Sequence, residues 1–297
     1  MPQLSQFVIT GITVGFVYAL VAIGFVLIWK SSRVANLALG QLVLISSWFA
    51  YGMLVQVGLP LWAAFPIVFA FALGLGWLLE RTALRPLIGQ PILSLITVTL
   101  GVGFAIEGIV NLIWPQSVAA LPRLFPQEPI QVGTAVVAQE YLWAAVISVI
   151  LFAALSLFFK YHKMGIAMRA FADDQMAVQA CGIPVTRMFS LSWMFACVLA
   201  ATGGILMSSI GGITFGLVET GLKAFSVVIL GGLDSFLGAI VAGPIIGLAE
   251  NLGSGLLYQN FPGMWPGVRE VIPFIIIIIV MFIRPHGLFG ERRIERI

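Results

Sequence analysis

FVITGITVGFVYALVAIGFVLIW, which spans Phe7–Trp29, is a stretch of sequence without one charged side chain. A helix needs about 20 mostly apolar residues to cross the hydrocarbon core of a bilayer. This stretch is therefore long enough and apolar enough to predict a membrane-spanning helix. The chain contains at least seven such stretches, which are separated by short polar joints.

The composition supports this prediction over the whole chain. Of the 297 residues, 60% are hydrophobic and 9% are charged, and the mean hydropathy is +1.08. A soluble domain carries about 25% charged residues, so a water-soluble fold is excluded. The apolar runs are continuous rather than alternating, which excludes a transmembrane β-barrel. We predict an all-α, polytopic integral membrane protein with about eight transmembrane helices in one domain, residues 1–297.

Positive charge gathers on one predicted side of the membrane. Twelve basic residues fall there: Lys30, Arg33, Arg81, Arg85, Lys160, Lys163, Arg169, Arg187, Arg284, Arg292, Arg293 and Arg296. Three fall on the opposite side: Arg123, Lys223 and Arg269. Because basic residues favour the cytoplasmic side, we predict a multi-pass protein of the plasma or inner membrane. Its N-terminus is expected outside and its C-terminus in the cytoplasm.

One region interrupts the regular succession of spans. Leu222–Leu230 is too short to cross a bilayer, and it is followed by the polar stretch 231–235 and a second apolar segment, Phe236–Leu257. This pattern favours a broken or re-entrant element near 222–257, of the kind that lines substrate paths in transporters. Two plain helices joined by a tight turn fit the residues equally well. Five consecutive isoleucines, residues 275–279, are expected to be helical in lipid.

Small residues recur four positions apart in three spans. The pairs and triplets are Gly11 and Gly15; Gly204, Ser208 and Gly212; and Ala239, Gly243 and Gly247. This spacing places them on one helix face, where they allow two backbones to approach closely. We expect these faces to pack against neighbouring helices.

The segment 160–187 is too polar to cross the membrane and lies on the predicted cytoplasmic side. Within it, Gly165–Pro184 reads GIAMRAFADDQMAVQACGIP. One face of the predicted amphipathic helix carries Met164, Met168, Phe171, Gln175 and Val178. Gly182 and Pro184 are typical of a helix end. The apolar side chains could dock in a groove of a cytoplasmic partner, or the helix could lie at the lipid interface.

The same segment resembles the coupling segment of ATP-binding-cassette importer permeases, and more narrowly that of the branched-chain amino-acid permease family. The similarity covers essentially the whole chain. Besides Arg169–Ile183, it rests on three stretches in a fixed order: Asn36–Gln41 (NLALGQ), Gly221–Phe225 leading to Leu230–Gly232, and Arg284–Gly290 (RPHGLFG).

The resemblance implies a transport subunit, not an enzyme, that works only in a complex. The expected partners are a second homologous permease, two ATP-binding subunits and an external solute-binding protein. ATP and Mg²⁺ would bind in the partner subunits, and this chain would hold no cofactor or metal and bind no nucleic acid. Indeed, the sequence contains no GxxxxGK[ST] phosphate loop. The expected substrates are branched-chain or other small neutral amino acids, or small amides, moved by alternating access.

In that picture the segment 160–187 docks onto an ATP-binding subunit. The residues expected to make this contact are Arg169, Ala170, Phe171, Asp173, Asp174, Gly182 and Ile183.

Polar side chains at membrane depth are costly and are candidates for a function. Glu107 and Glu250 are the clearest candidates for a translocation path, with Asn251 next to Glu250, and Asn36 and Gln41 are weaker ones. Each acid could instead bond to a neighbouring helix. A competing hypothesis is an ion-coupled carrier that is complete in one chain and uses Glu107 or Glu250 as its proton or sodium site.

Overall fold

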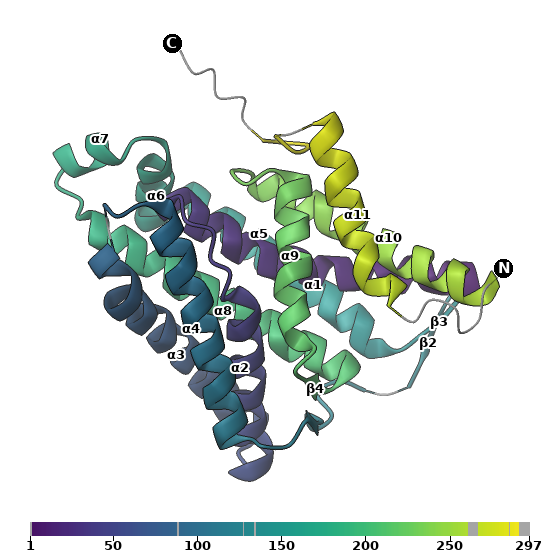
Figure 1. Cartoon of the computed structure of the whole chain (residues 1–297). Coiled ribbons are helices and arrows are strands. Elements are labelled where there is room, and N and C mark those ends of the chain that lie inside the picture. The colour runs from purple at the N-terminus through teal and green to yellow at the C-terminus, as the bar shows by residue number, and fades with distance from the viewer. Residues whose placement is uncertain are drawn as a thin grey trace.

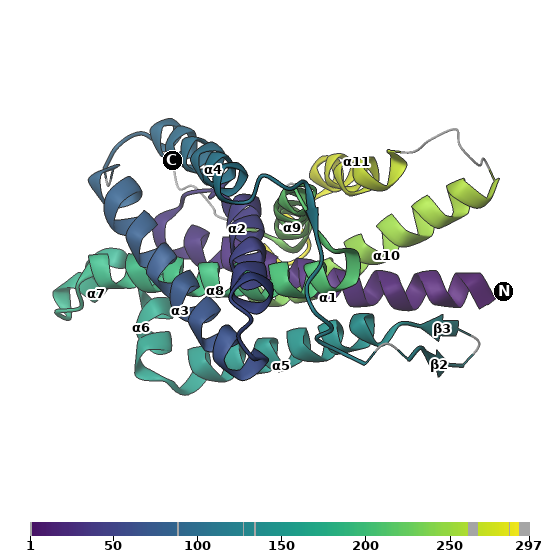
Figure 2. The same ribbon diagram turned by 90° about the horizontal axis from the view of Figure 1, so that it is seen from below.

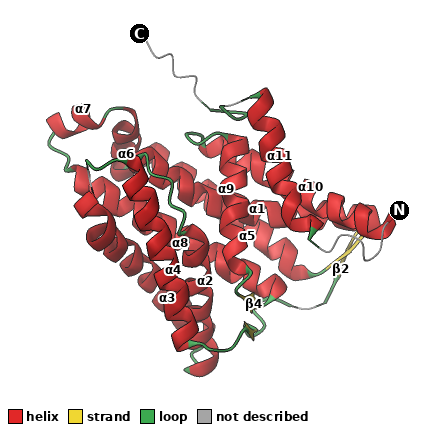
Figure 3. Cartoon of the chain, in the orientation of Figure 1, coloured by secondary structure: helices red, strands yellow, loops and turns green. Residues whose placement is uncertain are grey.

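The computed structural model describes residues 2–87, 89–126, 128–133, 135–260, 267–284 and 286–290. Within these residues the chain is a helical bundle, as predicted (Figure 3). Seven of its helical stretches are long and apolar enough to cross a membrane. They contain α1 (Pro2–Ser32), α2 (Leu39–Tyr51), α3 (Leu61–Leu79), α4 (Ile92–Ile113), α5 (Gln139–Tyr161), α8 (Val185–Gly211) and α10 (Phe236–Asn260).

The remaining helices are shorter. They are α6 (Lys163–Asp173), α7 (Gln175–Ala180), α9 (Leu217–Gly231) and α11 (Val268–Ile283). Single π-helical turns extend α2 and α3, at η1 (Gly52–Gln56) and η2 (Glu80–Leu84), and a 3₁₀ turn follows at η3 (Arg85–Leu87). The isoleucine run lies within α11 and is helical, which confirms the expectation for lipid.

The helix α1 forms the centre of the bundle. It packs against α5, α8, α9 and α10, and Figures 1 and 2 show it crossing behind and between them. Most of its side chains are buried, whereas α3, α4 and α5 are largely exposed over their outer faces. Most of the exposed side chains of these outer helices are apolar, as is expected of a surface that meets lipid.

The α1–α10 contact confirms the packing role predicted for the small residues. A Cβ atom on Gly11 would lie 2.9 Å from the carbonyl oxygen of Gly247, and one on Gly15 would lie 2.6 Å from the Cα of Pro244. Neither backbone atom can move aside, so any larger side chain would force the helices apart. Gly204 of α8 meets Val43 of α2 in the same way, with 2.6 Å to its carbonyl oxygen.

The irregular region predicted near 222–257 is a short helix, a glycine turn and a full-length helix. α9 ends at Gly231, and Gly232 has a φ of 107°, a conformation that favours glycine. The segment 286–290 then covers the end of α9. The N–H groups of Leu288 and Phe289 donate to the carbonyls of Leu230 and Gly231, at 2.8 and 3.0 Å. The RPHGLFG stretch therefore caps the end of α9 through its backbone.

The described residues also form four very short strands, which were not predicted. β1 (Val118–Ala119) pairs antiparallel with β4 (Ile213–Thr214), and β2 (Ile130–Val132) pairs antiparallel with β3 (Ala135–Val137). They lie in the connections α4–α5 and α8–α9, where extended backbone satisfies its hydrogen bonds by local pairing. They tie these loops together without changing the helical class of the fold.

Candidate functional site

The predicted coupling segment folds as two helices rather than one. Asp174 has an extended backbone, with φ −145° and ψ 105°, and separates α6 from α7. Its side chain accepts hydrogen bonds from the N–H groups of Met176 (2.8 Å) and Ala177 (3.0 Å), and so caps the start of α7. Gly182, with φ +80°, ends α7 as predicted.

The apolar face of this segment packs onto the chain itself. Phe171 is 1% exposed, and its ring lies edge-on against Phe189 of α8 with 5.5 Å between centroids. Met168 and Val178 are buried beside it. The stripe that could have met a partner or lipid therefore supports the segment from inside.

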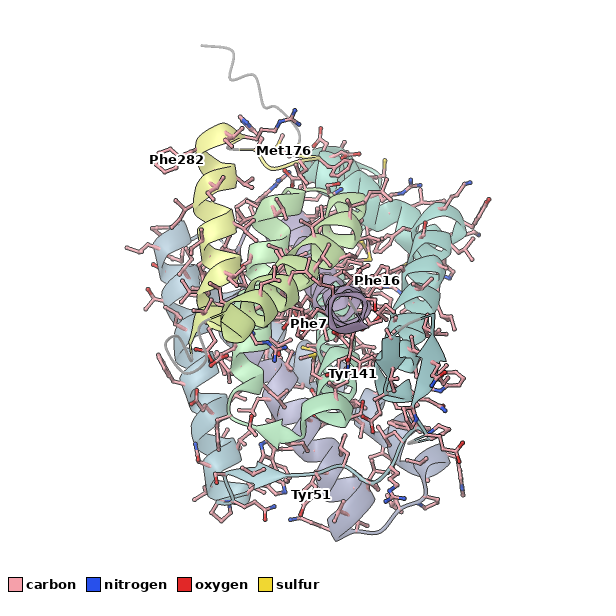
Figure 4. All side chains as sticks on the ribbon, turned by 90° about the vertical axis from the view of Figure 1, so that its right-hand side faces the viewer. Phe7, Phe16, Tyr51, Tyr141, Met176 and Phe282 are labelled. Carbon is pink, nitrogen blue, oxygen red and sulfur yellow. The ribbon has the colours of Figure 1, made fainter. Side chains whose placement is uncertain are left out.

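The opposite face of the segment is open. Met176 is 78% exposed, and Arg169, Ala170, Asp173 and Asp174 are also exposed. Figure 4 shows Met176 at the same end of the molecule as Phe282, with Tyr51 at the other end. Gly182 is exposed and Ile183 is half-buried, whereas Phe171 cannot contact another subunit in this conformation.

Two long-range contacts join the segment to the membrane helices. Arg33 follows α1 with a φ of +57°. Its guanidinium pairs with Asp234 in the α9–α10 turn at 2.7 Å and reaches the carbonyl of Ala172 in α6 at 3.5 Å. The side chain of Gln175 donates to the carbonyl of Ser31 at 2.9 Å. A displacement of α6 and α7 would therefore be transmitted to both α1 and the start of α10.

A cavity of about 190 Å³ lies at this end of the bundle, between the η2 and η3 turns and the helices α4, α7 and α8. Glu80 is 1% exposed and lines it. Both oxygens of Glu80 accept from Arg85, at 3.0 and 2.8 Å, and Ser190 donates to Oε2 at 2.6 Å. This carboxylate is fully paired, so it joins η2 to α8.

The acid Glu250 is held inside the bundle by two cations. Lys223 of α9 and Arg269 of α11 both donate to its Oε1, each at 2.8 Å, and Glu250 itself is fully buried. The ammonium of Lys223 also lies 5.9 Å from the ring centroid of Tyr18 in α1. The cluster joins α9, α10 and α11 around one carboxylate, which is the structural alternative considered for this residue.

The other candidate acid, Glu107, lies in a different part of the bundle from Glu250. It is half-buried in α4, and its carboxylate has no hydrogen bond or ion pair to any residue that the structure describes. Figure 2 shows α4 and α10 on opposite sides of α9, so the structure does not bring Glu107 and Glu250 together.

Asn251 packs beside Gly11 at the α1–α10 contact and donates to its own helix at the Gly247 carbonyl (3.1 Å).

Asn36 and Gln41 flank the start of α2, deep in the bundle. Asn36 is 0% exposed, and its Oδ1 accepts from the N–H of Ala38 at 3.0 Å. The side-chain Cδ and Oε1 of Gln41 each lie 3.1 Å from the Cβ position of Gly103, close to the middle of α4. The chain between the end of α1 and the start of α2 is therefore non-helical backbone (Figure 1).

The outward face of α4 is unusual for a surface in lipid. It combines polar Thr97 and Asn111 with Gly101 and Gly108, and all four are exposed. A Cβ on either glycine would meet nothing within 4 Å. Because polar groups and bare backbone are disfavoured against hydrocarbon, this face is suited to contact protein or water.

Three residues with long-range polar contacts were not recognised as functional candidates from the sequence. Arg33 looked like an ordinary cytoplasmic charge, Lys223 like one of few outer charges, and Glu80 like part of a polar joint. Their partners lie 201, 27 and 110 residues away in the chain. The only available signal was an ionisable residue in or beside a span.

The sequence and the fold are both similar to those of known proteins. The model of the family described as branched-chain amino acid transport system / permease component matches residues 7–281. The high-affinity branched-chain amino acid transport system permease protein LivH of Escherichia coli is 28% identical, over 98% of this chain and 97% of LivH. The corresponding BraD of Pseudomonas aeruginosa is 27% identical over the full length of both chains.

Similarity extends to an archaeal protein and to a solved structure. A probable LivH permease of Methanocaldococcus jannaschii is 28% identical over 91% of this chain and 88% of its own. PsaBC from Streptococcus pneumoniae, solved in complex with Fab, superposes with a TM-score of 0.53 over 96% of this chain and 93% of that chain, at 16% identity. This last similarity supports the fold alone.

Proposed function

The chain belongs to the family of branched-chain amino acid transport permease components, and from this premise we propose that it is the membrane subunit of an ATP-driven importer. Its cargo would be leucine, isoleucine, valine or a related small neutral amino acid. LivH and BraD are named as branched-chain amino acid permeases, which supports this substrate class. ATP hydrolysis and Mg²⁺ binding would take place in partner subunits.

The observation that carries the proposal is the way α6 and α7 are built. Their apolar side is anchored by Phe171, while Met176 and Asp173 face away from the chain. Arg33 and Gln175 then connect this exposed element to α1 and to the α9–α10 turn. Such an arrangement suits a surface that contacts an ATP-binding subunit and transmits the movement of that subunit to the membrane spans.

The charge distribution supports a cytoplasmic position for this end. Arg33, Arg85 and the segment 160–187, all predicted to be cytoplasmic, lie around one end of the bundle, together with the turn at Asp234. The C-terminal stretch 286–290 packs against the same end through Leu230 and Gly231. By the positive-inside rule this end would face the cytoplasm, and ATP-binding subunits would then bind on this side and a solute-binding protein on the other.

The exposed face of α4 supports a second permease subunit. Thr97, Gly101, Gly108 and Asn111 form a strip that a second transmembrane subunit would cover, since small and polar residues are typical of helix contacts in membranes. Between the two subunits this strip, with Glu107 beside it, would also border the substrate path.

The competing ion-coupled carrier is weakened by the surroundings of Glu250. A proton or sodium site needs a carboxylate that can exchange its cation with water. Glu250 already binds two cationic side chains through one oxygen and is fully buried. Only Glu107 stays available for such a role.

The test is co-purification of the chain from its native membrane, followed by an ATPase assay. Asp173→Arg and Met176→Asp are the informative variants, because both side chains are exposed and neither caps a helix. Asp174→Arg is less suitable, since it would also remove the cap of α7. Arg123→Asp, an exposed charge in the α4–α5 connection, is the matched control.

We expect both variants to release the ATP-binding subunits or to uncouple hydrolysis from uptake, while Arg123→Asp does neither. Purification of the chain alone, with uptake driven by an ion gradient, would overturn the importer proposal and direct attention to Glu107.

A further inference from the structure

The segment that enters the membrane between α1 and α2 leaves two buried polar groups unpaired. The Nδ2 of Asn36 and the Oε1 of Gln41 are buried and have no hydrogen-bond partner in the described structure. One is a donor and the other an acceptor. Buried polar atoms are almost always paired with protein, water or a ligand, so Asn36 Nδ2 needs an acceptor and Gln41 Oε1 needs a donor.

The position of these groups is close to the middle of the membrane. Leu37 donates to Thr99 Oγ1 at 3.4 Å, and Gln41 touches Gly103, the twelfth residue of a helix that runs over Ile92–Ile113. Because a spanning helix crosses the bilayer at about 1.5 Å per residue, the middle of α4 marks the middle of the span. The start of α2 therefore lies at mid-depth rather than at the membrane surface (Figure 1).

The start of α2 adds a third feature. No side chain caps α2, and its first N–H groups point toward the incoming chain at the positive end of the helix dipole. Asn36 folds over this end, because its Oδ1 bonds to the N–H of Ala38 while its Nδ2 stays free. Free helix N–H groups next to an unpaired amide donor favour a carboxylate.

The contacts that close this place are made by glycines. Gly40 of α2 lies directly against Val218 and Gly221 of α9, and Gly103 of α4 lies against Gln41. The glycines at these contacts let α9 and α4 lie directly against α2. A state of the transport cycle that opens these contacts would uncover Asn36 and Gln41.

We propose that the start of α2 is a transit site for an amino-acid zwitterion. The substrate carboxylate is bound by Asn36 Nδ2 and the first N–H groups of α2, and the substrate ammonium by Gln41 Oε1. The site recognises the ammonium and carboxylate groups that all α-amino acids share, and it does not discriminate between their side chains. This inference rests on the proposed import function and deepens it by naming where the charged ends of the cargo are carried across the apolar core.

A bound water molecule is the other possible occupant, because water can pair with a donor and an acceptor at once. The two occupants predict opposite orders for two substitutions at Asn36. Asn36→Asp keeps the bond to Ala38 and the shape of the side chain, whereas Asn36→Leu loses that bond. If only water binds, Asp is therefore the milder change.

If a zwitterion binds, Asp is the harsher change, because it places a negative charge against the substrate carboxylate. The assay is uptake of labelled leucine into liposomes that contain the complete importer, compared at equal amounts of assembled complex. We expect Asn36→Asp to lower uptake by about tenfold, the effect of one buried hydrogen bond to a charged group, and by more than Asn36→Leu does. Gln41→Glu should be tolerated, whereas Gln41→Lys should not.

Ser47→Ala is the matched control, because Ser47 is a buried polar residue of the same helix whose hydroxyl is already bonded to Val43. It should leave uptake unchanged. The reverse order, with Asn36→Leu more harmful than Asn36→Asp, would overturn the proposal.

A second measurement covers variants that fail to assemble. Asn36→Cys, made together with Cys181→Ser to remove the exposed native thiol, is treated with anionic and cationic thiol reagents of similar size during ATP turnover. We expect the anionic reagent to react faster and leucine to slow it. Equal rates or no protection by leucine would refute the site. Failure of the import function itself would look different, since unmutated complex would then show no ATP-dependent uptake.

Discussion

Glu250 and Glu107 are both carboxylates within membrane spans, but their surroundings differ completely. Glu250 is fully buried and paired with Lys223 and Arg269, whereas Glu107 is half-buried with no described partner. An intramembrane acid can therefore hold helices together or face outward to a path or a second subunit. The sequence environment of the two residues is similar, so only the partners tell them apart.

The largest effect is expected from breaking the Glu250 cluster. Glu250→Ala leaves two cations without their counter-charge and should lower the free energy of unfolding by about 3–5 kcal/mol, the typical cost of removing one partner of a buried pair. Equilibrium unfolding in mixed detergent micelles measures this. Replacing the acid together with Lys223 by apolar residues should recover much of the loss. A mild effect of Glu250→Ala alone would show that the charges are hydrated.

A smaller effect on stability is expected from the pair between Arg33 and Asp234. Its side chains are 33% and 23% exposed, so solvent screening limits its contribution to about 1 kcal/mol or less. The effect on coupling should be larger, because Arg33 joins the end of α1 to the α9–α10 turn and also contacts the Ala172 carbonyl of α6. Asp234→Asn should lower the number of leucine molecules transported per ATP hydrolysed. The exchange Arg33→Asp with Asp234→Arg should restore part of it.

The variant Arg33→Gly distinguishes the contribution of the ion pair from the cost of the backbone conformation at Arg33. Arg33 has a φ of +57°, which glycine adopts without the cost that other residues carry. The glycine variant should therefore be at least as stable as Arg33→Ala and equally uncoupled. If coupling survives in both variants, the link between α6 and the turn is made elsewhere.

The smallest effect on stability is expected at Glu107. Since no described residue pairs with it, Glu107→Gln should change the unfolding free energy of the purified chain by less than about 0.5 kcal/mol, as for other substitutions away from packed features. In the assembled importer the same substitution should reduce uptake if the α4 face borders the substrate path. A large loss of stability in the isolated chain would instead assign Glu107 a structural role like that of Glu250.

Much of the fold could be predicted, because membrane helices are specified locally. Each apolar stretch must satisfy its own backbone hydrogen bonds in lipid, so length and hydropathy suffice to identify it. The same locality explains why the isoleucine run in α11 and the small-residue contacts of α1 with α10 agree with expectation. Long-range partners carry no such local pattern, and for that reason Arg33 and Glu80 were not recognised.

The coupling segment illustrates both situations. Its amphipathic character and its end at Gly182 were readable from spacing, but the break at Asp174 was not. Nor could the sequence tell whether the apolar stripe faces outward. Phe171 meets Phe189 of α8, and such a contact depends on how the spans pack.

By itself, the sequence determined that this protein is a helical membrane protein with a polar segment between its spans, and its similarity indicated a permease. Only the tertiary structure decided which charges pair, which face of α6 and α7 is open, and that Gln41 at the start of α2 lies against the middle of α4. The physical reason is that hydropathy acts on one segment at a time. Ion pairs, glycine contacts and unpaired buried groups arise only when distant segments are brought together.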